Sequence, residues 1–116
     1  MTQSTATLTD NQTVLDALNA CVAACENCAT ACLHEEHVKH MVGCVLLDRD
    51  CADICALTAR FVARNSPHAK HIMRECIELC QLCHNECAKH NDTHCQLCAA
   101  ACKACLEACK AHLESN

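Results

Sequence analysis

The chain has 116 residues, with 16 Cys, 9 His, a formal net charge of −5 at pH 7 and a single aromatic residue among Phe, Tyr and Trp, Phe61. Without stacking surfaces or a basic face, it lacks what nucleic-acid binding requires. One Gly and one Pro cannot supply the turns of a many-stranded β fold or a phosphate-binding loop. The composition therefore predicts an all-α protein, and the length predicts one domain.

Four helices are predicted in chain order, at about 9–34, 36–64, 67–90 and 93–113. The third is expected to begin with Ser66 as N-cap and Pro67 as first helical residue. The fourth is expected to begin behind the cap region of residues 91–93. Residues 1–8 are expected to be disordered and residues 9–116 to form a single domain. Because the connections are short, the helices should form an antiparallel, up-down four-helix bundle.

The cysteine content raises a question of compartment. No stretch reaches the roughly 18 apolar residues of a membrane span, and the first residues show neither a basic nor an apolar signal region. A cytoplasmic protein is therefore expected. Yet 16 Cys in 116 residues is about 14%, which exceeds the roughly 8 to 10% typical of secreted disulfide scaffolds. The two observations conflict, because the cytosol keeps thiols reduced.

The spacing of the cysteines suggests what they do. Within helices they follow each other by alternating steps of three and four, with one step of seven between Cys44 and Cys51. This is a heptad pattern that places every thiol on the bundle axis. The d positions are Cys21, Cys28, Cys44, Cys51, Cys76, Cys83, Cys98 and Cys105, and the a positions are Cys25, Cys32, Cys55, Cys80, Cys87, Cys95, Cys102 and Cys109.

Axial cysteines could have several roles. Cys could act as a small hydrophobe, but Ala or Val would fill the same volume without oxidation chemistry. Cysteines four apart on one helix are poorly placed for a disulfide; bridges between helices remain open but do not suit the compartment. Iron–sulfur ligation is disfavoured, because its motifs wrap a loop around the cluster. A thiol redox enzyme would need one distinct reactive Cys, and a di-iron enzyme would need paired Glu-x-x-His motifs. A copper-sensing repressor would need a basic face. The sequence shows none of these features.

The net charge of the metal–thiolate sites distinguishes zinc from Cu(I). Four-thiolate zinc sites would each carry two negative charges, and sixteen thiols would place about eight uncompensated charges in the core. One Cu(I) per thiolate is neutral, and thiolate selects Cu(I). A near-linear S–Cu–S unit spans roughly 4 to 4.5 Å, which side chains at i and i+4 can match. The sixteen Cys are therefore predicted to bind many Cu(I) ions; zinc or cadmium sequestration and a thiol redox role are the alternatives.

These motifs resemble a known family. The run Cys44-Val-Leu-Leu-Asp-Arg-Asp-Cys51-Ala-Asp-Ile-Cys55 and the Cys-rich helices around it are similar to those of the bacterial copper storage proteins, over about residues 12–113. The resemblance implies a four-helix bundle that stores Cu(I) in the cytosol without catalysis, and a homo-oligomer, a tetramer. Leu46 and Leu57, outside the core positions, are compatible with an oligomer. A copper chaperone or chelator would be a natural delivery partner.

One end of the bundle is predicted to admit the metal. The first and third connections lie at the same end, and there His37, Met41 and His90 occupy d, a and d positions. We expect these three to receive Cu(I) and pass it to the thiolates. The neighbouring His34, His40 and His94 could equally be solvated. Asp48, at an a position, could accept hydrogen bonds, ligate an outer ion or remain solvated.

The other end is expected to be closed. Its axial residues, with Phe61 nearby, are Val14, Leu18, Thr58, Val62 and Met73. Three histidines near this end, His68, His71 and His112, are expected to be solvated.

Overall fold

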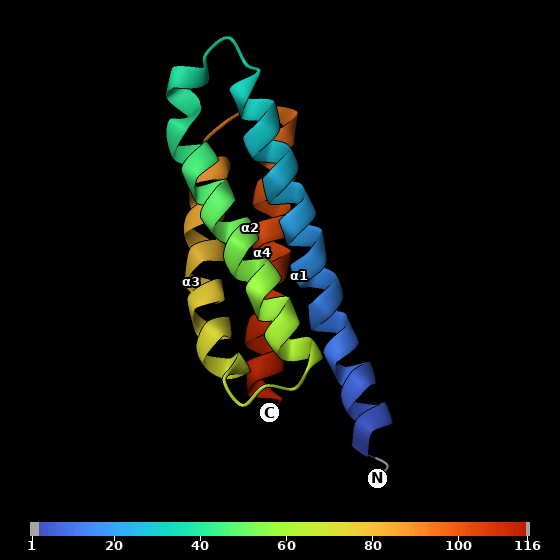
Figure 1. Ribbon diagram of the computed structural model, residues 1–116. Coiled ribbons are helices and arrows are strands. Elements are labelled where there is room, and N and C mark those ends of the chain that lie inside the picture. The colour runs from blue at the N-terminus through green and yellow to red at the C-terminus, as the bar shows by residue number, and fades with distance from the viewer. Residues whose placement is uncertain (1–2, 116) are drawn as a thin grey trace.

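The computed structural model describes the backbone of residues 3–115 and the side chains of residues 11–115. This part of the chain contains four α-helices, one short 3-10 helix and no strand. In order they are α1 (Gln3–Leu33), η1 (Val38–Met41), α2 (Val42–Ala63), α3 (Ala69–Cys87) and α4 (Thr93–Glu114). Figure 1 shows consecutive helices running antiparallel, so the predicted up-down four-helix bundle is confirmed.

Two helix starts differ from the prediction near the N-terminus and after the first connection. α1 begins at Gln3, so residues 3–8 are helical where disorder was expected; residues 1–2 lie outside the described residues. Neither Gly nor Pro interrupts a helix there, and Figure 1 shows this end of α1 extending beyond the rest of the bundle. α2 begins only at Val42, because a 3-10 turn, η1, occupies the preceding residues.

The start of α3 also differs, whereas α4 begins as predicted. The N-cap of α3 is His68, and Ser66 acts one step earlier: its Oγ accepts a hydrogen bond from the backbone N–H of His68 at 3.1 Å. The Ser66 hydroxyl thus organises the turn before the helix. Asp92 is the N-cap of α4, inside the predicted cap region.

The helices form a square in cross-section. α1 packs against α2 and α4, and α3 packs against the same two helices, so α1 and α3 are diagonal. The molecule measures 56 × 19 × 18 Å, which is a long, narrow rod with one central axis. Buried alanines such as Ala29, Ala52 and Ala99 flank that axis. Small side chains there let the helices approach closely around the cysteines.

The end near the α2–α3 connection is closed as the sequence predicts. Its axial residues are all at most 3% exposed: Val14, Leu18, Thr58, Val62 and Met73. Asn65, which has a positive φ of 53°, turns the chain out of α2. The buried Asn11 on α1 donates hydrogen bonds to the Val62 carbonyl at 3.2 Å and to Asn65 Oδ1 at 2.9 Å. This contact attaches α1 to the connection.

Candidate metal centre

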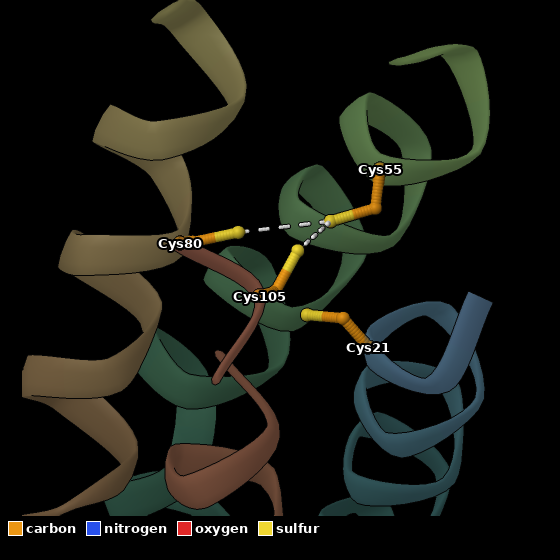
Figure 2. A group of neighbouring side chains, drawn as sticks. All are labelled: Cys21, Cys55, Cys80 and Cys105. Atoms are coloured by element: carbon orange, nitrogen blue, oxygen red, sulfur yellow. Dashed lines mark hydrogen bonds between the residues drawn. The ribbon is translucent and has the colours of Figure 1, made fainter. Parts of the chain in front are cut away.

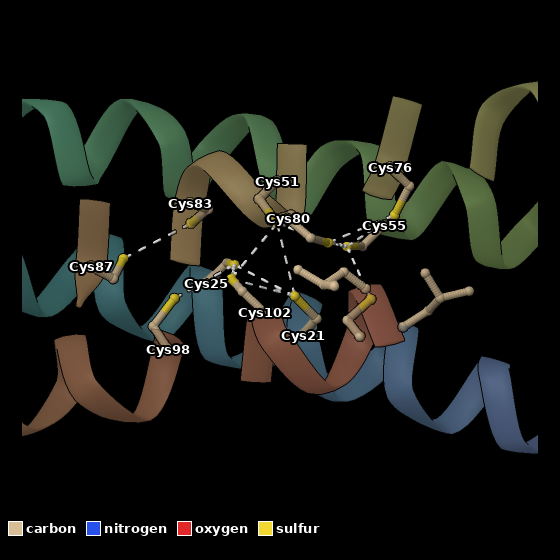
Figure 3. Packing of buried hydrophobic residues seen from close by; sticks show 14 of the residues in the cluster. Cys21, Cys25, Cys51, Cys55, Cys76, Cys80, Cys83, Cys87, Cys98 and Cys102 are labelled. Carbon is tan, nitrogen blue, oxygen red and sulfur yellow. Dashed lines mark hydrogen bonds between the residues drawn. The ribbon is translucent and has the colours of Figure 1, made fainter. Parts of the chain in front are cut away.

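All sixteen cysteines are free thiols, and the side chain of each is 0% exposed. Every helix contributes a line of them to the common axis, as the heptad assignment predicts (Figure 3). Five of the same-helix pairs four residues apart have Sγ atoms separated by 3.9 Å: Cys21–Cys25, Cys28–Cys32, Cys51–Cys55, Cys76–Cys80 and Cys83–Cys87. A small movement opens each pair to the roughly 4 to 4.5 Å of a linear S–metal–S unit.

Contacts between helices join these pairs into a continuous column. Cys21, Cys55, Cys80 and Cys105, one from each helix, form a group whose sulfur atoms all lie within 4.8 Å of one another (Figure 2). Cys55 Sγ is 3.7 Å from Cys80 Sγ and 3.9 Å from Cys105 Sγ. Since Cys21 also belongs to a neighbouring four-thiol group, an ion can move from one group to the next without leaving sulfur ligands.

Asp48 interrupts the sulfur column near the mouth, the end formed by the α1–α2 and α3–α4 connections. The side chain is fully buried, and Oδ1 accepts hydrogen bonds from the thiols of Cys83, Cys87 and Cys98 at 3.2, 3.3 and 3.2 Å. Burial raises the pKa of Asp48 to about 10. In the metal-free protein this carboxyl is therefore neutral at pH 7.

His94 is the imidazole that reaches the thiols at the mouth. Its Nδ1 lies 3.6 Å from Cys28 Sγ, 3.9 Å from Cys32 Sγ and 3.6 Å from Cys95 Sγ. The four side chains could hold a metal ion together. Its Nε2 lies 2.8 Å from a carboxylate oxygen of Glu35. That carboxylate orients the ring and leaves Nδ1 facing the sulfur atoms.

The three residues predicted to receive the metal occupy different depths. Met41 is fully buried within the core. The side chain of His90 is 16% exposed, with Nε2 3.0 Å from Glu86, whereas that of His37 is 49% exposed, with Nε2 3.5 Å from Asp92. Met41 therefore lies inside the mouth, and both imidazoles lie at its rim, held by carboxylates.

Two thiols near the mouth, those of Cys32 and Cys95, are protonated in the absence of metal. Burial raises the pKa of Cys32 to about 12, and burial likewise raises the pKa of Cys95. Both thiols must lose a proton when they bind a metal ion. A metal ion bound by these two thiols would therefore displace two protons, and the positive charge of the ion would compensate the thiolate charge.

Sequence reasoning undervalued His94 and missed the carboxylates around it. His94 directly precedes Cys95, so it lies off the heptad axis, and only its place in the first turn of α4 lets the ring bend toward the thiols. The signal that could have identified it is the Asp92-Thr-His94-Cys95 run at a helix start. The i,i+4 spacing of Glu86 and His90 could have identified that pair, whereas nothing in the spacing marks Glu35 as the partner of His94.

Four helices that line a common axis with thiols, with a histidine and a buried carboxyl near one end, define a bundle for binding many thiophilic metal ions. The family described as copper storage protein matches residues 7–114 of the chain. The chain belongs to this family.

Known relatives agree in sequence and in fold. The chain is 43% identical over 91 residues to the uncharacterized cysteine-rich protein YhjQ of Bacillus subtilis strain 168, which covers 78% of this chain and 84% of that protein. The Cu(I)-bound copper storage protein BsCsp3 is 42% identical, with a TM-score of 0.85, over 88% of this chain and 96% of that one. A cytosolic copper storage protein of Streptomyces lividans, with five coppers, is 32% identical, with a TM-score of 0.89. The match covers 94% of this chain and 96% of that one.

Proposed function

We propose that this chain stores Cu(I), binding many ions along its column of thiolates, in the cytosol and without catalysing a reaction. The observation that carries the proposal is the column itself: sixteen buried free thiols, with neighbouring sulfur atoms 3.2 to 4.0 Å apart. The family membership and the Cu(I)-bound relative support it. No helix in the described part of the chain is long and apolar enough to cross a membrane.

Electrostatics favours Cu(I) over zinc or cadmium. The sulfur groups are fully buried, so a four-thiolate site with a divalent ion would leave two negative charges out of water, which is costly. One Cu(I) per thiolate leaves no net charge. A thiol redox function is disfavoured because a reactive cysteine has to be accessible, whereas all sixteen are 0% exposed.

Anaerobic titration of the reduced protein with Cu(I), against a chelator of known affinity, tests the proposal. We expect uptake of about one ion per thiol, on the order of fifteen to twenty ions per chain, with an affinity well above that for Zn(II) measured in parallel. Saturation at about four Cu(I), or tighter binding of zinc, would contradict storage of Cu(I).

We propose that Cu(I) enters at the mouth, where His37 and His90 at the rim accept it from a chaperone or chelator. His94 and Met41 then pass it to Cys28, because imidazole and thioether are both ligands for Cu(I). The burial of Met41 and the 3.6 Å distance from His94 Nδ1 to Cys28 Sγ support this order.

Replacing His94 tests this route. We expect His94→Ala to slow the first phase of Cu(I) transfer from a chelate by about tenfold, while the final capacity falls by no more than about one ion. His40→Ala is the matched control, because His40 is an exposed histidine at the same end. Stopped-flow absorbance of the chelate measures both variants. Equal rates for His94→Ala and the unmodified protein would exclude His94 from the route.

We also propose that copies of this chain associate through the face of α2 that carries Val42 and Leu46. These side chains are 54% and 62% exposed and lie one helical turn apart; Leu57 is half-buried. We expect sedimentation equilibrium to give a mass near that of a tetramer of the 12.6 kDa chain, and Leu46→Glu to lower it. A monomer at micromolar concentration would contradict the proposal.

A further inference from the structure

The closed end of the bundle also carries sulfur and imidazole ligands. On α3, Met73 lies three residues before Cys76, and on α4, His112 lies three residues after Cys109. Because the two helices are antiparallel, both steps lead outward from the thiol column toward the same end. Met73 is 1% exposed and His112 is half-buried, so the pair runs from the core toward the surface.

The mouth has the same pattern. Met41 lies three residues before Cys44, and His90 lies three residues after Cys87. As at the closed end, the methionine is buried and the histidine is half-buried. Each end of the column thus has one Met-x-x-Cys step and one Cys-x-x-His step.

Two cavities flank His112 and reach the residues that close this end. One, of about 140 Å³, is lined by His112, Met73 and Asn65 among others, and the other, of about 150 Å³, by His112 and Val14 among others. Each has room for several water molecules or a metal ion. Two residues of the axial plug, Met73 and Val14, are therefore walls of open cavities, and the plug can be approached from both sides of His112.

The thiol column begins directly behind Met73. Cys76 Sγ lies 3.6 Å from Cys55 Sγ and 3.9 Å from Cys80 Sγ, and Cys55 belongs to the group that takes one thiol from each helix (Figure 2). An ion held by the Met73 thioether would thus be one ligand exchange from the inner thiols.

We propose that His112 and Met73 form a second Cu(I) port, through which ions exchange with the inner end of the column. The inference rests on the proposed storage of Cu(I). Because Val14 and Leu18 keep apolar bulk beside the path, this port is slower than the mouth and matters most when the mouth is blocked.

The test uses a background variant, His94→Ala with Met41→Leu, whose mouth is impaired. In this background we expect addition of Met73→Leu and His112→Ala to slow Cu(I) transfer from a chelate about tenfold further. His71→Ala, an exposed histidine at the same end, is the matched control and should change nothing. We also expect substoichiometric Cu(I) to shift the ¹³C-methyl NMR signal of Met73 in the background variant.

The outcomes separate this inference from the storage function. An unchanged transfer rate after both substitutions, with full capacity, would overturn the second port and leave storage intact. Failure of every variant and of the unmodified protein to take up Cu(I) would overturn both. His112→Ala alone, at a half-buried position near the end of α4, provides the same comparison of rates if the buried Met73→Leu change impairs folding.

Discussion

Loading the protein with Cu(I) is expected to raise its midpoint of thermal unfolding by more than about 20 °C. The metal-free core consists largely of thiols, which pack as small and weakly interacting apolar groups. A site occupied at about a thousand times its dissociation constant adds about 4 kcal/mol to the free energy of unfolding. Several such sites together account for a shift of this size, since 1 kcal/mol corresponds to roughly 4 to 8 °C in a domain of about this length.

The arrangement of the thiol groups explains why the effect should be cooperative. The group of Cys21, Cys55, Cys80 and Cys105 takes one ligand from each helix. Metal–thiolate bonds there connect all four helices at one level of the bundle. At the mouth, by contrast, the group of Cys28, Cys32, His94 and Cys95 joins only α1 and α4.

Differential scanning calorimetry of matched variants can separate the two kinds of group. Replacing the four cysteines of the four-helix group by Ala should remove more of the Cu(I)-induced shift per thiol than replacing Cys32 and Cys95 by Ala; Cys28 is kept, because it also belongs to a group with Asp48, Cys87 and Cys98 that joins all four helices. Each shift is taken relative to the metal-free form of the same variant, so cavities left by the substitutions cancel. Equal losses per thiol would show that connecting the four helices is not the source of the stability.

The heptad spacing was sufficient to predict the thiol column. A residue at an a or d position of a helix in a four-helix bundle has to face the axis, and all sixteen cysteines do so. The same rule placed Asp48 and Met41 in the core correctly. Helix ends were harder, because η1 and the late start of α3 depend on local turns such as the Ser66 hydrogen bond to His68.

The histidines at the mouth show where a periodic pattern stops being informative. His37 and His90 have axial heptad positions, yet their imidazoles are paired with Asp92 and Glu86 at the rim. His94 has an off-axis position, yet it contacts three thiols. Heptad geometry holds only inside a continuous helix, and at helix ends the direction of a side chain depends on tertiary contacts that sequence spacing does not encode.

Asp48 should make the metal-free protein less stable as the pH rises. Its pKa is about 10 in the folded protein against an ordinary value of 3.8. Between these two values the folded state holds a proton that the unfolded chain releases. The contribution of Asp48 to stability is therefore fully present below about pH 4 and is lost as the pH rises toward 10. From pH 5 to 8 we expect the free energy of unfolding to fall by about 1.4 kcal/mol per pH unit from this group.

Chemical denaturation of the metal-free protein and of Asp48→Asn under reducing conditions measures this contribution. Asparagine cannot ionise and keeps a hydrogen-bond acceptor for the three thiols, so the variant should lack the slope. Its advantage in stability over the unmodified protein should therefore grow by about 4 kcal/mol between pH 5 and pH 8. The difference between the two curves cancels the titration of the histidines and of the cysteines, which both proteins share. Asp50→Asn, at an exposed position of the same helix, should retain the unmodified slope. Parallel curves for the unmodified protein and Asp48→Asn would mean that the buried carboxyl is already ionised in the folded state, and that the thiols around it stabilise its charge before any copper binds.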